Sequence, residues 1–175
     1  MHYFIAPVFR PYHPIINTIT AMISIIITAI VGLYQHISYN GFPYGPFKTL
    51  NERIQSSMEQ GDVIIHSSKL SYLPSFYYDQ GLSQGYIADP PGSNVDTLSP
   101  ATRDILNLNS YEDLEEATAN APRVWFIIYQ NSIDEYMSTG NGTHPHLEYL
   151  DSNFKLKSVE SWGDIRLYLY IRNTP

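Results

Sequence analysis

The chain has 175 residues, enough for one domain of ordinary size and a short additional segment. It carries 10 Lys and Arg against 17 Asp and Glu, a formal net charge of -7, which argues against nucleic acid as a partner because phosphate neutralisation needs a surplus of cations. A hydrophobic content of 43% excludes a wholly disordered chain. Because there is no cysteine, disulfides, thiolate zinc sites and cysteine nucleophiles are excluded as well.

The first feature in chain order is a long apolar segment over residues 15–34, inside a stretch from 11 to 47 that has no charged side chain. Fourteen of its twenty residues are apolar and eight are isoleucine. Twenty helical residues span roughly 30 Å, the thickness of a bilayer's hydrocarbon core. The segment predicts a transmembrane helix. The alternatives are a buried helix of a soluble protein and a signal peptide, but the run is longer than a signal core and no small-x-small cleavage site follows it.

The charges around this segment predict its orientation. Arg10 precedes it, whereas the next cation in the sequence is Lys48. By the positive-inside rule the N-terminus lies in the cytoplasm, and the remaining residues lie on the extracytoplasmic side of the cell membrane.

Three regions follow from these patterns: a membrane-spanning segment over 1–36, an interfacial linker with a short helix over 37–60, and an extracytoplasmic α/β domain over 61–175. The linker is rich in Gly, Pro and aromatic residues, and the short helix carries Leu50, Ile54 and Met58 at four-residue spacing.

The third region alternates between β-prone and helical patterns. Short runs of β-branched or alternating apolar residues predict strands at Val63–His66, 85–88, 124–129, 154–160 and Ile165–Arg172. Helical patterns fall at 70–78, 133–137 and 145–150. We therefore predict an α/β fold whose mixed sheet is parallel in the middle and ends in a C-terminal antiparallel hairpin.

Two further predictions concern the start of one helix and the burial of the last strand. Ser110, with Glu112 and Asp113 after it, matches the start of a capped helix that continues to about Asn120. Regular alternation of apolar residues with Arg and Tyr in Ile165–Arg172 predicts a last strand with one covered face.

Four side chains are predicted to bind a ligand: His66, Tyr77, Tyr78 and Asp89. His66 ends the first predicted strand, at the sheet edge where open α/β sheets collect ligands, and Asp89 lies in a later loop. Tyr77 and Tyr78 belong to an aromatic cluster that suits either sugar stacking or a core and membrane-proximal surface. No catalytic residue and no cofactor are indicated.

Two further chemistries are weaker in the sequence. His66 with a following serine and with Asp79 or Asp89 has the residue types of a hydrolase triad, but no Gly-x-Ser-x-Gly segment presents the serine. His144 and His146, near Glu148, have the residue types of a zinc site, but the intervening proline directs the two histidines apart. We expect no metal.

The order of the segments carries a resemblance. After the hydrophobic helix come Gly61-Asp62-Val63-Ile64-Ile65-His66, Ala88-Asp89-Pro90-Pro91-Gly92, Pro122-Arg123-Val124-Trp125 and Leu167-Tyr168-Leu169-Tyr170. This arrangement resembles the C-terminal part of bacterial-type GT-C glycosyltransferases, the group with protein mannosyltransferase-like and lipid A aminoarabinose transferase-like members. In these enzymes the last membrane helix is followed by a small extracytoplasmic α/β domain.

The resemblance implies an accessory domain of a membrane glycosyltransferase that uses a polyprenyl-phosphate sugar. The family's catalytic carboxylates lie in an early loop between membrane helices that has no match here, so none is transferred, and the chain is either a fragment of such an enzyme or a stand-alone domain without the chemistry. The implied partners are the lipid bilayer and, through a parent enzyme, a polyprenyl-phosphate sugar or a glycan acceptor. The alternative is a single-pass, membrane-anchored protein-interaction module without enzymatic activity.

Overall fold

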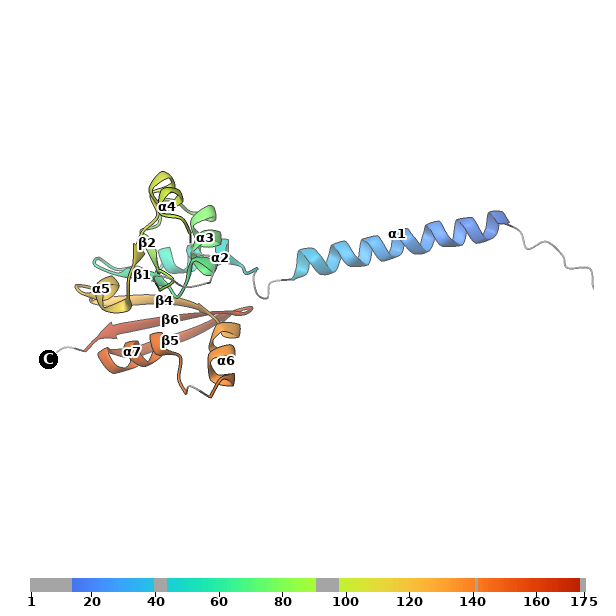
Figure 1. Cartoon of the computed structure of the whole chain (residues 1–175). Helices are drawn as coiled ribbons and strands as arrows, with labels where there is room; N and C mark the ends of the chain where they lie inside the picture. The colour runs from blue at the N-terminus through green and yellow to red at the C-terminus, as the bar shows by residue number, and fades with distance from the viewer. Residues whose placement is uncertain (1–13, 40–43, 91–97, 141, 174–175) are drawn as a thin grey trace, which may run out of the picture. The chain divides into compact units, whose positions relative to one another are not determined.

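The computed structural model describes residues 14–39, 44–90, 98–140 and 142–173. The chain divides into two compact units, Met1–Tyr39 and Asn40–Pro175 (Figure 1). Each unit is considered by itself below.

The described residues of the first unit, 14–39, form helix α1 (Pro14–Ser38). Its segment Ile16–Ser38 has 23 residues and a mean hydropathy of 2.1, and none of its most apolar window is buried. The hydroxyls of Thr20, Ser24 and Thr28 each donate to the carbonyl four residues earlier, at 2.9, 3.0 and 2.9 Å, so the helix itself satisfies these three hydroxyls. By length and composition this helix is a candidate membrane span, as predicted.

The second unit is built on a six-stranded mixed sheet with the order β3-β2-β1-β4-β6-β5 (Figure 1). The pairs β1–β2, β2–β3 and β1–β4 are parallel, whereas β4–β6 and β6–β5 are antiparallel. This arrangement confirms the predicted fold class. The strands are β1 (Val63–His66), β2 (Gln84–Ile87), β3 (Ser110–Tyr111), β4 (Arg123–Tyr129), β5 (Phe154–Trp162) and β6 (Ile165–Arg172).

Helices cover both faces of this sheet. One hydrophobic cluster joins the sheet to α5, α6 and α7, and a second joins its other face to α2. Helix α3 lies on the α2 side, where Tyr72 and Tyr86 belong to a third cluster. The bounds are α2 (Phe47–Gln55), α3 (Lys69–Tyr78), α4 (Pro100–Leu106), α5 (Leu114–Thr118), α6 (Gln130–Ser138) and α7 (Pro145–Asn153).

Strand β4 lies at the centre of the core, and all seven of its residues are buried. Val124, Phe126 and Ile128 face the helices α5 to α7, and the alternate residues Trp125 and Ile127 face α2. A strand buried on both faces favours apolar residues on both, which explains the apolar run from Val124 to Tyr129, and the buried Arg123 at the start of β4 is paired with Asp62. Each buried apolar side chain contributes about 1.5–3 kcal/mol through burial.

The prediction of one covered face for the last strand was wrong. Ile165 and Leu167 of β6 pack in the α2-side cluster, while Tyr170 is buried in the opposite cluster. The reason is topological, because β6 lies between β4 and β5 rather than at the sheet edge. The polar end of the buried tyrosine is satisfied, since its hydroxyl donates to Asp151 Oδ1 at 2.8 Å.

The predicted helix start at Ser110 was also wrong. Ser110 belongs to β3 and pairs with Tyr86 of β2, and the N-cap of α5 is Asp113, whose carboxylate accepts from the Glu116 amide at 2.8 Å. Close packing holds β3 in place: a Cβ on Gly85 would lie 2.5 Å from the Tyr111 ring, so this position must be glycine. Tertiary pairing therefore prevailed over the local capping pattern.

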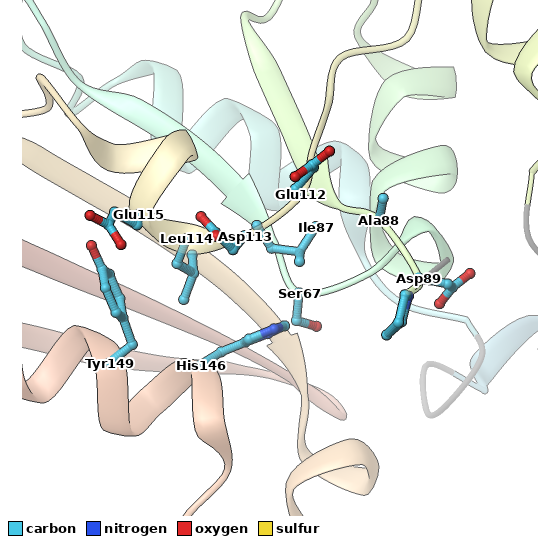
Figure 2. Close-up of a pocket in the computed structure, with 11 residues that line it drawn as sticks. Ser67, Ile87, Ala88, Asp89, Glu112, Asp113, Leu114, Glu115, His146 and Tyr149 are labelled. Carbon is cyan, nitrogen blue, oxygen red and sulfur yellow. The ribbon is translucent and has the colours of Figure 1, made fainter. Parts of the chain in front are cut away.

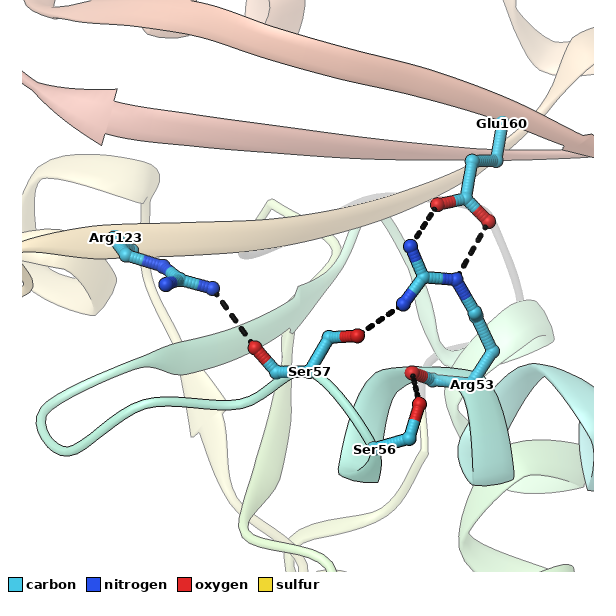
Figure 3. A network of polar contacts seen from close by, with 5 residues as sticks. All are labelled: Arg53, Ser56, Ser57, Arg123 and Glu160. Atoms are coloured by element: carbon cyan, nitrogen blue, oxygen red, sulfur yellow. Dashed lines mark hydrogen bonds and ion pairs between the residues drawn. The ribbon is translucent and has the colours of Figure 1, made fainter.

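The Gly-Asp-Val and Arg-Val-Trp segments of the sequence converge in the fold. The buried carboxylate of Asp62 accepts a hydrogen bond from Trp125 Nε1 at 2.8 Å and pairs with Arg123 Nε at 3.2 Å. Figure 3 shows how the contacts continue: Arg123 donates to the Ser57 carbonyl at 3.0 Å, and Arg53 binds Glu160 through two nitrogens. These bonds fix residues 56–62 against β4 and β5. Helix α2 ends at Gln55, so Met58, which the sequence placed in the same helix, lies beyond it. The Gly-Asp-Val and Arg-Val-Trp segments therefore have a structural role in this domain.

Candidate functional site

Two adjoining cavities open where the parallel strands end, and together they form what we call the strand-end cleft. The first has a volume of about 400 Å³ and the second about 590 Å³. They share five lining residues, Ala88, Asp89, Pro90, Glu112 and Asp113. Figure 2 shows the first cavity, which Ser67, Ile87, Leu114, Glu115, His146 and Tyr149 also line.

The topology explains this location. Ser67 directly follows β1, Ala88 and Asp89 follow β2, and Glu112 follows β3, so the carboxyl ends of three parallel strands deliver their loops to one edge. The Ser67 amide donates to the Ile127 carbonyl of β4 at 2.8 Å, at the point where the chain order of the sheet reverses. Open α/β sheets bind ligands at this switch point.

The first cavity combines carboxylates with a neutral imidazole. His146 projects from α7 toward Ser67 (Figure 2), and its Nδ1 is buried without a hydrogen-bond partner in the described structure. Burial and the neighbouring His144 lower the pKa of His146 to about 4, so the ring is uncharged at neutral pH. It packs edge-on against Phe126, with 6.0 Å between the ring centroids. The cavity therefore offers carboxylate oxygens, an uncharged imidazole and the Tyr149 ring.

The second cavity contains the cationic side chains of the cleft. Lys69 Nζ forms an ion pair with Asp89 Oδ2 at 2.8 Å, and both side chains are largely buried. Arg103 donates from Nη1 to Ser110 Oγ at 3.0 Å, while its buried Nε has no hydrogen-bond partner among the described residues. Because Lys69 already has a partner, the carboxylates at Glu112 and Asp113 keep this edge acidic.

His66 does not line the cleft. Its side chain is fully buried, and its Nε2 lies 2.9 Å from Gln84 Oε1, which also accepts from Ser75 Oγ at 2.8 Å. Burial lowers the pKa of His66 to about 4, which keeps the ring neutral. The hydrolase constellation is not assembled in the part of the chain that the structure describes, because Asp89 is bound to Lys69 and Asp79 is bound to Gln55 and to the Gly81 amide.

The other predicted binding residues divide between the surface and the cleft. Tyr77 and Tyr78 are 77% and 54% exposed on α3 and line neither cavity, whereas Asp89 lines both. Sequence reasoning missed Glu112, His146 and Tyr149. Glu112 was missed because β3 is only two residues long and its segment was interpreted as a helix start; once β3 is known, the rule about strand ends identifies it.

The side chain of His144 caps α7, whereas that of His146 lines the cleft. The two rings lie 5.0 Å apart between their centroids, so the prediction that the intervening proline directs them apart was wrong. Pro145 opens α7 as predicted, and His144 is its N-cap, with Nδ1 accepting from the His146 amide at 3.3 Å. Among the described residues, no group of three or more His, Asp or Glu side chains is placed to hold a metal ion.

The cleft also lacks a phosphate-binding turn of the dinucleotide type. Ser67 and Ser68 connect β1 to α3, where that motif requires a glycine-rich turn. The carboxylates of the strand-end cleft disfavour a free anion and suit hydrogen-bond donors such as hydroxyl groups.

Comparison with known proteins adds little to this description. No family model matches the chain, and no curated protein matches it. Among solved structures, the chain is similar to the 16S rRNA methylase RmtB, with 15% sequence identity over 71% of this chain and a TM-score of 0.36. The match spans 61% of that protein, and a likeness at this TM-score supports no inference about activity. Fold and site thus define an α/β domain with a strand-end cleft, preceded in the chain by a candidate membrane span.

Proposed function

We propose that the chain is a membrane-anchored accessory domain of a glycosyltransferase that uses a polyprenyl-phosphate sugar, with the α/β domain on the extracytoplasmic side. One observation carries the proposal: a candidate span of 23 residues precedes a domain whose cleft is lined by carboxylates and contains no assembled nucleophile among its described residues. The transfer chemistry then belongs to a membrane-embedded catalytic portion, and the cleft holds the glycan part of the donor or acceptor.

The composition of the cleft supports a polyhydroxylated ligand. Asp89, Glu112 and Asp113 present acceptor oxygens to sugar hydroxyls, and Tyr149 and the neutral His146 present ring surface. Hydrogen bonds to charged groups contribute about 1.5–3 kcal/mol each, so loss of one carboxylate acceptor weakens binding about tenfold or more.

The proposal can be tested with the full chain in lipid nanodiscs. Polyprenyl-phosphate mannose in the disc, or methyl mannoside in solution, should perturb the NMR signals of residues in the cleft. Glu112→Gln and Asp113→Asn should weaken this binding, because an amide is a poorer acceptor; asparagine still caps α5. Glu135→Gln on the exposed surface of α6 is the matched control and should bind as the unmodified chain does.

Two results would contradict the proposal. Equal affinity of the Glu112→Gln variant and the control would remove the cleft from ligand binding. Sugar transfer by the purified chain alone would show that it is itself catalytic.

The protein-interaction module is the second candidate, and strand β5 is the observation that favours it. β5 is a nine-residue edge strand on which Leu156 and Val159 are 42% and 46% exposed. Lys155, Lys157 and a register shift between Leu156 and Ser158 are features that protect edge strands from indiscriminate pairing. Pull-down of a stoichiometric partner whose binding does not depend on carbohydrate would favour this function over the first.

A further inference from the structure

Helix α3 carries an apolar surface that the domain leaves uncovered. Leu70, Pro74, Tyr77 and Tyr78 follow the i, i+4, i+7, i+8 spacing of one helix face, which we call the α3 outer face. Leu70, Tyr77 and Tyr78 are 48%, 77% and 54% exposed, and the two tyrosine rings meet edge to face with 5.3 Å between their centroids. Two adjacent, largely exposed aromatic rings on one helix are unusual unless something covers them.

The opposite side of α3 fixes this orientation. Tyr72 is buried against Tyr86, with 4.9 Å between the ring centroids, and Ser75 is bonded to both Asn51 and Gln84. Rotating the helix to bury Tyr77 would expose Tyr72 and break these buried hydrogen bonds. The domain therefore holds the α3 outer face toward the outside.

The chain connectivity limits how far this face lies from a membrane. Eight residues separate Ser38, the last residue of α1, from Phe47, the first residue of α2, and even fully extended they span only about 30 Å. Helix α2 packs beside α3, since Asn51 Nδ2 donates to the Ser75 carbonyl at 2.9 Å. The α3 outer face therefore lies on the helix that packs against α2, and α2 is the first helix after α1 among the described residues.

The chemistry of the face matches the interfacial region of a bilayer. It has no charged side chain, whereas the chain as a whole has a net charge of -7 that anionic headgroups would repel. The charged side chains on either side of the face already have partners. Lys69 pairs with Asp89, and the Asp79 carboxylate accepts from Gln55 and from the Gly81 amide. Tyrosine, with an apolar ring and a polar hydroxyl, is enriched at the level of the lipid headgroups.

We infer that the α3 outer face docks on the interfacial region of the membrane in which α1 is anchored. The inference depends on the anchoring in the proposed function, but not on the glycan ligand. Docking restricts the orientation of the domain, so that the α2 side of the sheet faces the lipid and helices α5 to α7 face away.

Tryptophan fluorescence in nanodiscs tests this inference with the full chain. Tyr77→Trp keeps an interfacial aromatic residue, and Met137→Trp is the matched control, because Met137 is 57% exposed on α6, across the sheet. Each variant is reconstituted in discs of ordinary phosphatidylcholine and in discs with bromine on the upper acyl chain, and the signal of the native Trp125 and Trp162 is subtracted. We expect the added emission of Tyr77→Trp to fall at least about twofold in brominated discs and that of Met137→Trp to stay unchanged.

A second substitution separates docking from simple proximity. Adding Tyr78→Ser to Tyr77→Trp should reduce the quenching, whereas adding Tyr136→Ser on α6 should not. Equal quenching at positions 77 and 137, or no quenching at 77 in a chain that co-purifies with the discs, would overturn the docking while leaving the anchoring intact. A chain that does not enter the discs would overturn the anchoring itself, and the docking with it.

Discussion

Helix α1 and strand β4 are both predominantly apolar segments, yet their surroundings are opposite. All seven residues of β4 are buried inside the domain, whereas the most apolar window of α1 has no buried residue. The length of the run distinguishes them. Seven extended residues fit across a small domain and are covered by helices on both faces, while a helix of 23 residues matches a bilayer.

The largest expected effect is a loss of domain stability caused by a substitution in β4. Phe126→Ala should lower the free energy of unfolding of the domain by about 3–5 kcal/mol, because a fully buried ring leaves a cavity on the α5 to α7 face. Chemical denaturation followed by Trp fluorescence measures this. Met137→Ala, at an exposed position, should change the midpoint little, and partition of the chain into membranes should be unaffected by either substitution.

The converse substitution lies in α1. Ile26→Lys, near the middle of the candidate span, should disfavour insertion by about 2.5–3.5 kcal/mol, since a charge at the bilayer centre is costly. Alkaline extraction of membranes should then release a larger fraction of the chain, while the unfolding midpoint of the domain stays unchanged. Ile26→Leu is the control. A domain that unfolds when α1 is charged would mean that α1 belongs to its core.

Low pH should lower the free energy of unfolding of the domain. Burial lowers the pKa of His66 to about 4, below the usual value near 6.5, so between these values the unfolded chain binds more protons and the folded state loses stability as the pH falls. The loss from this group is about 3 kcal/mol between pH 6.5 and pH 4. His66→Gln should flatten the pH dependence of the unfolding free energy by a comparable amount. Superimposable slopes for the two proteins would contradict the assignment.

The smallest effect concerns the polar contact built into β4. Trp125→Phe removes the hydrogen bond from Nε1 to the buried Asp62 carboxylate and should cost about 1–3 kcal/mol of unfolding free energy. Trp162→Phe is the matched control, because the buried Nε1 of Trp162 has no hydrogen-bond partner among the described residues, and it should cost less. The reverse order would show that Asp62 is not held by this bond.

Local patterns predicted most elements. The β-branched run at Val63–His66 was confirmed at both ends, and the C-terminal hairpin was confirmed in position because alternation and the turn at Gly163, with φ of 63°, are properties of neighbouring residues. β3 was not predicted, since a strand of two residues has no periodicity to recognise. Its pairing with β2 depends on residues more than twenty positions away.

The candidate site was less predictable for the same reason. The position of Asp89 follows from the rule that parallel strands end at one edge, and this residue does line the cleft. His66 ends a strand on the same edge, but its side chain turns into a buried network with Gln84 and Ser75. His146 reaches the cleft from α7, and no spacing in the sequence connects it with Ser67.

The sequence by itself determined where the chain is apolar enough to enter lipid, where it extends into strands and where it turns, because these depend on the composition and period of adjacent residues. Only the tertiary structure decided which polar groups are buried and which are presented. Tyr72 is buried and Tyr77 is exposed although they share one helix, and Asp62 joins Trp125 across the fold. Such choices depend on how distant segments pack, and close packing leaves one arrangement that satisfies both the apolar surface and the buried hydrogen bonds.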